Sequence, residues 1–79
     1  SQPLHKKFSL QLISSNGYDY STSELKLSKS TNHQIITFNQ TFDIHLVDKN
    51  RPTYLMVYVL QNGKARANKI VNLMDFDLV

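Results

Sequence analysis

The sequence predicts an all-β fold, a small antiparallel β-sandwich of about six to eight strands. Apolar and polar residues alternate over residues 8–13, 23–29 and 35–46, which is the period of two expected of strands with one face in solvent. Residues 54–60, YLMVYVL, are apolar or aromatic throughout, as in a strand covered on both faces. Turn signals recur at intervals of roughly ten residues, and no long helical pattern interrupts them.

The first half of the chain contains two of these strands. Residues 8–13, FSLQLI, form the first, which ends at SSNG, residues 14–17, because Asn and Gly tolerate the positive φ angles of tight turns. Residues 18–20, YDY, fit either a short strand or the following loop. Residues 23–29, SELKLSK, predict a half-exposed strand with its two leucines inward.

The centre of the fold is expected between residues 35 and 60. Residues 35–46 predict one long strand, with a bend or bulge at Asn39-Gln40, where Gln40 interrupts the inward row. Residues 47–53, VDKNRPT, predict a charged turn whose proline cannot donate to a ladder. Residues 54–60 then form the buried strand.

The last part of the chain returns to the sheet. Residues 61–64, QNGK, predict a second Asn-Gly turn, and residues 65–68 a short polar connection. Residues 70–78 predict a final strand. Their apolar positions also fit a helical turn, because the periodicity of so short a run does not distinguish a strand from a helix. The core is expected to consist mainly of Phe8, Leu10, Leu12, Leu25, Leu27, Phe38, Phe42, Ile44, Leu46, Leu55, Val57, Val59, Ile70 and Leu73.

The composition is that of one small domain. We expect residues 8–79 to form it, after a flexible lead-in over residues 1–7. A chain of 79 residues buries only about 60 to 65% of its unfolded surface. It ends directly after the apolar MDFDLV, and we therefore expect it to be a piece of a longer protein. The absence of cysteine favours a reducing, cytoplasmic location, and no apolar run is long enough to cross a bilayer.

The second half of the chain carries a resemblance to a known family. Residues 38–44, FNQTFDI, are followed by YLMVYV at 54–59, by a loop over 62–68 and by KIVNL at 69–73. This order resembles that of C2 domains, which are β-sandwiches of signalling and membrane-scaffold proteins. Full C2 domains are longer, so the chain would lack a strand or resemble the trimmed forms of anillin-type scaffolds. An immunoglobulin-like sandwich is the alternative.

The loops that hold calcium in many C2 domains lack the necessary ligands here. Calcium requires six to eight oxygen ligands, which those domains supply from aspartates in two loops. Residues 60–66, LQNGKAR, contain no acidic residue, and the loop near Asn16 offers only Asp19. The resemblance therefore implies a calcium-independent member, and we predict no metal site and no cofactor.

No pattern predicts an enzyme. His45 and Asp43 share the polar face of a predicted strand, but two solvated residues are the favoured interpretation. No serine stands in a nucleophile elbow, and the two glycines each follow an asparagine in a turn, so no loop could cradle phosphate. Three histidines without a cysteine form no zinc pattern. We therefore predict no catalytic residues.

Two basic clusters are the candidate binding residues. Lys26 and Lys29 form one cluster on the outward face of a strand and its turn, and Lys64, Arg66 and Lys69 form the other. In C2 domains a lysine-rich patch and the loops that point at membranes are sites for anionic lipid headgroups, so the resemblance assigns lipid or anion binding to these five residues. Each charge contributes on the order of 1 kcal/mol near an anionic leaflet. The alternative is a solvated surface that keeps a small domain soluble.

The function expected is that of a non-catalytic binding or scaffold module. It would contact anionic membrane lipids, a protein partner or both, in the cytoplasm or peripherally at a membrane. The alternative is a protein-interaction sandwich without a lipid role, which binds a partner or forms a homodimer through its edge strands.

Two further features are assigned minor roles. Nucleic acid is not expected to bind, because Tyr54 and Tyr58 share the parity of core positions and do not form exposed stacking platforms. Residues 39–41, NQT, are a glycosylation sequon, which is used only if the domain is lumenal or extracellular.

Overall fold

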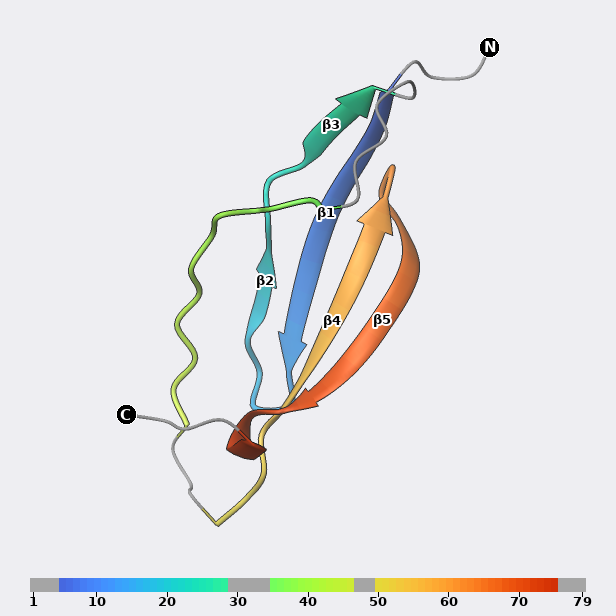
Figure 1. Ribbon diagram of the computed structural model, residues 1–79. Helices are drawn as coiled ribbons and strands as arrows, with labels where there is room; N and C mark the ends of the chain where they lie inside the picture. The colour runs from blue at the N-terminus through green and yellow to red at the C-terminus, as the bar shows by residue number, and fades with distance from the viewer. Residues whose placement is uncertain (1–4, 29–34, 47–49, 76–79) are drawn as a thin grey trace.

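The fold is an antiparallel β-sheet built around its longest strand. The computed structural model describes residues 5–28, 35–46 and 50–75, and this part of the chain holds five strands and one short 3-10 helix (Figure 1). The predicted all-β class is confirmed. The elements are β1 (His5–Ser14), β2 (Asp19–Ser21), β3 (Leu25–Ser28), β4 (Tyr54–Gln61), β5 (Lys64–Asn72) and η1 (Leu73–Asp75).

Strand β1 pairs with three other strands. The sheet has the order β2-β1-β4-β5, and β3 also pairs with β1. On one edge β1 pairs with β4, from Phe8 opposite Gln61 to Ser14 opposite Leu55. Its other edge is shared, since β3 pairs with residues 5–8 and β2 with residues 11–13. Residues 5–7 of the predicted lead-in thus belong to β1, because β3 provides backbone partners for them.

The Asn-Gly turn between β4 and β5 determines where β5 begins. Asn62 and Gly63 have φ angles of 52° and 79°, and positive φ at both central residues is the mark of a two-residue type I′ hairpin. Such a turn reverses the chain at once, so residues 65–68 belong to β5: Ala65, Ala67 and Asn68 lie opposite β4, and Arg66 lies at a register shift of the ladder. The connection predicted there is wrong, and β5 continues to Asn72, where η1 follows.

Residues 35–46, predicted as a long strand, run as an extended chain beside β2 without joining the ladder (Figure 1). Asn39 has a φ of 47°, at the position where a bend was expected. This left-handed residue interrupts the extended geometry that a continuous ladder requires. The strand prediction is therefore wrong here, although the alternation holds: Phe42 and Ile44 are half-buried, and the residues next to them are exposed.

Side chains near β2 hold this segment against the sheet. The Tyr20 hydroxyl donates to the Asp43 carbonyl at 2.7 Å, and the His45 N–H donates to the Tyr18 hydroxyl at 3.2 Å. The Phe42 ring stacks on Tyr20 with centroids 4.9 Å apart, and Tyr20 stacks on Tyr18 at 5.7 Å. Tyrosine hydroxyls thus take the place of backbone ladder bonds along this edge.

The apolar face of the sheet is only half-buried. Among the described residues no apolar side chain is fully buried, and the buried side chains are those of Ser9, Ser14 and Thr53. The residues predicted to share a face in the central strands do so, because Leu12 lies opposite Val57 of β4, but residues of both parities in these strands are half-buried. The second sheet of the predicted sandwich is not present in the described part of the chain.

Replacing Leu12 by Ala tests this degree of burial. A fully buried Leu loses about 2 to 5 kcal/mol on truncation, so a half-buried one should lose about 1 to 2 kcal/mol of unfolding free energy. The measurement is urea denaturation, with Gln11→Ala on the other face of β1 as the control, expected within about 0.5 kcal/mol of wild type. A loss of about 4 kcal/mol for Leu12→Ala would contradict the half-buried face and point to a covering layer.

Candidate anion-binding site

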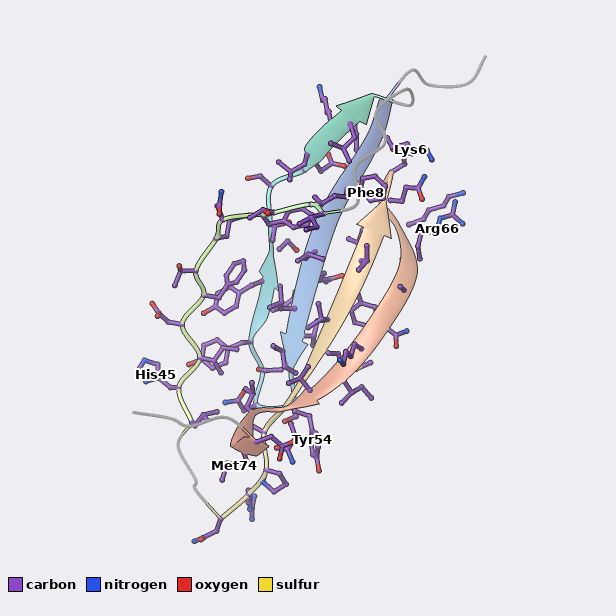
Figure 2. All side chains as sticks on the ribbon, in the orientation of Figure 1. Lys6, Phe8, His45, Tyr54, Arg66 and Met74 are labelled. Atoms are coloured by element: carbon purple, nitrogen blue, oxygen red, sulfur yellow. The ribbon has the colours of Figure 1, made fainter. Side chains whose placement is uncertain are left out.

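Five cationic side chains lie at one end of the sheet. Lys6 and Lys7 lie in β1, Lys26 in β3, and Lys64 and Arg66 at the start of β5. We call these five residues the basic end. All five are exposed, and Figure 2 shows the side chains of Lys6 and Arg66 where β1 begins and β4 turns into β5.

Strand pairing and one turn build the basic end. Lys7 lies directly opposite Lys26 in the β1–β3 ladder. The Lys7 N–H donates to the Asn62 side-chain oxygen at 3.0 Å, and the Asn62 N–H donates to the Lys7 carbonyl at 2.8 Å. The turn that carries Lys64 is thereby fastened to β1. Because neighbouring strands lie about 5 Å apart, the cations from β3 to β5 span roughly 15 Å.

The structure joins most of the two predicted clusters into one site. Lys26, Lys64 and Arg66, predicted as parts of separate clusters, belong to the same end of the sheet. Lys69 lies apart, opposite Val57 in the middle of β4. Val57 is four residues along β4 from Gln61, the partner of Lys64, so Lys69 is roughly 13 Å from Lys64 along the sheet by the rise of a strand. Lys29 lies outside the described residues.

Lys6 and Lys7 were missed as site residues. Their position directly before the first apolar alternation is the only sequence signal that they continue the strand. That signal is weak, because their strand conformation depends on pairing with β3 and with the β4–β5 turn. A local pattern contains no information about such distant partners.

Most carboxylates in the described part of the chain lie away from the basic end, which therefore keeps a positive charge. Asp19 pairs with Ile13 near the opposite end of β1, Asp43 bonds through its carbonyl to Tyr20, and Asp75 follows the end of β5. Glu24 stands next to β3. Exposed cations without a matching cluster of carboxylates attract anions at long range, and salt screens that attraction.

The other candidate chemistries receive no support in residues 5–28, 35–46 and 50–75. No group of three His, Cys, Asp or Glu side chains there could hold a metal ion. His45 and Asp43, the one His-Asp pair considered, are exposed, and their backbone groups hold the tyrosines of the β2 edge. None of the described helices has the length or hydropathy needed to span a bilayer.

Comparisons with protein families, with curated proteins and with solved structures find no match to this chain. The C2 resemblance therefore stays a prediction from the residues.

The opposed lysines of the basic end provide a test of the β1–β3 register. Like charges directly opposite each other in a ladder destabilise it, and an opposite-charge pair contributes about 0.2 to 1 kcal/mol. Lys26→Glu should therefore raise the free energy of unfolding by about 0.5 to 1 kcal/mol at low salt. The gain should largely disappear near 1 M salt, where the Debye length is about 3 Å.

Lys69→Glu is the matched control, since it makes the same charge change opposite the apolar Val57. Denaturation of both variants at low and high salt gives the comparison. Equal stabilisation by the two variants would show that the effect is one of net charge and would contradict the pairing of Lys7 with Lys26.

Proposed function

We propose that this chain is a non-catalytic, calcium-independent binding module whose basic end contacts anionic membrane lipids. The observation that carries the proposal is the convergence of five exposed cations from β1, β3 and β5 on one end of the sheet. A flat anionic surface can engage such an end without a pocket. The two opposed lysines, which repel each other in the free protein, gain from an anion that lies between them.

The strength expected is modest and dependent on salt. Each cation near an anionic leaflet contributes on the order of 1 kcal/mol, and the contribution falls off within a Debye length. Five such charges support reversible attachment. Calcium would add nothing, because the cations of the protein itself face the lipid phosphates.

The proposal includes the finer architecture of a C2-like sandwich at the cytoplasmic face of a membrane. The apolar face that carries Leu12 and Val57 is half-buried in the described part of the chain. A second layer would remove its remaining apolar area from water, and Leu12→Ala would then cost about 4 kcal/mol instead of the roughly 1 to 2 kcal/mol expected of the sheet alone. The lack of cysteine supports a reducing compartment.

Liposome sedimentation of charge-reversal variants tests the lipid contact. The wild-type protein should sediment with phosphatidylserine or phosphoinositide vesicles at low salt, should be unaffected by EDTA, and should be released as salt rises. Lys26→Glu should weaken binding at least tenfold, because it reverses a charge within the basic end. Lys69→Glu, with the same net charge, should bind within about twofold of wild type.

This design separates binding from folding, because Lys26→Glu is expected to be the more stable protein. A loss of binding in that variant is therefore not a consequence of unfolding. If the wild-type protein stays in the supernatant at low salt whatever the lipid, or if Lys69→Glu weakens binding as much as Lys26→Glu, the basic end is not a lipid site.

A further inference from the structure

The outer edge of β5 is open in the part of the chain that the structure describes. The sheet ends at β5, a strand of nine residues that pairs only with β4 among the described strands (Figure 1). A strand with one unpaired edge offers a row of N–H and C=O groups to another extended chain.

The hydrogen bonds around β4 identify which groups face outward. The Ser15 N–H donates to the Tyr54 carbonyl at 2.9 Å, so even-numbered residues of β4 direct their backbone groups to β1 and odd-numbered ones to β5. In register, β5 residues 67, 69 and 71 bond to β4. The backbone groups of Asn68, Ile70 and Asn72 therefore point to the open edge.

The charges on β5 select the partner. Lys64, Arg66 and Lys69 are exposed cations, and β5 contains no carboxylate. A second copy of the strand would bring these cations beside their equivalents, and lysines on an edge oppose such self-pairing. A strand rich in Asp or Glu would be attracted by the same charges.

The two faces of β5 differ in the side chains they offer. Lys69 lies on the face of Val57, and Ile70 on the opposite face beside Met56. Ile70 is 60% exposed and borders an apolar hollow of about 430 Å³ that Ile13, Tyr54 and Met56 also line. An added strand with carboxylates on the Lys69 face and apolar side chains on the Ile70 face would match both.

We propose that β5 binds an extended acidic peptide segment, in which acidic and apolar residues alternate, as an added strand of the sheet. The backbone groups at Asn68, Ile70 and Asn72 supply the hydrogen bonds, Lys69 and its basic neighbours attract the carboxylates, and the Ile70 hollow receives an apolar side chain. This site lies mostly outside the basic end and does not depend on lipid binding.

The test removes one outward N–H and keeps the β4–β5 ladder. Proline at an outward position of an edge strand lacks only the donor that faces the partner. Asn68→Pro is therefore compared with Asn68→Ala, which keeps the N–H. The probe is a fluorescent peptide of about eight residues with alternating Glu and Val, and binding is measured by anisotropy after circular dichroism has verified the sheet in both variants.

Asn68→Pro should weaken binding of this probe at least tenfold relative to Asn68→Ala, and Lys69→Glu should also weaken it. Lys26→Glu, which tests the lipid site, should leave peptide binding within about twofold of wild type. Equal binding by the proline and alanine variants would overturn the proposal, as would equal binding of a Lys-Val peptide. A dimer by sedimentation that Asn68→Pro dissociates would show that a second copy occupies the edge, which also overturns it.

Discussion

The structure depends on the backbone pairing of β1, which joins β2, β3 and β4 into one sheet, to which β5 is added through β4. One edge of β1 bonds to β4, and the other bonds first to β3 and then to β2. These pairings join residues far apart in the sequence, so the ladder must offset loop-closure entropy as well as the repulsion between Lys7 and Lys26. The same pairing places the cations of the basic end together, because the start of β1 lies between β3 on one side and the β4–β5 turn on the other.

The sheet has little apolar burial to stabilise it, and polar contacts contribute correspondingly more. Among the described residues the buried side chains are serines and a threonine. The Ser14 hydroxyl accepts from the Tyr18 N–H at 2.8 Å, which supports the turn before β2. Hydroxyls that bond to backbone each contribute about 1 kcal/mol net, less than a packed side chain. In the part of the chain that the structure describes, the faces of the sheet are thus only partly covered and the outer edge of β5 is open.

Much of the sheet could be predicted from local patterns. The apolar run identified β4, Asn62-Gly63 identified the hairpin turn, and Leu12 and Val57 share a face as predicted. The course of residues 35–46 could not be predicted. Alternation shows that one face of a segment is in solvent and the other is covered, but it does not show whether a neighbouring strand forms backbone hydrogen bonds with it. The start of β5 is small and polar, and it forms a strand because the preceding turn places it beside β4. The basic end depends on two non-local contacts, the pairing of β1 with β3 and the contact of β1 with the β4–β5 turn. The sequence therefore showed only two separate basic clusters.

An NMR titration of the isotope-labelled protein with a soluble inositol phosphate tests whether the five cations of the basic end bind an anion as one site. Amide shifts should stay constant around Asp43 and His45 beside β2. They should change with one affinity at the five residues of the basic end, Lys6, Lys7, Lys26, Lys64 and Arg66. Changes spread evenly over all exposed cations, including Lys69 and Arg51, or centred away from the start of β1, would contradict a single site at the basic end.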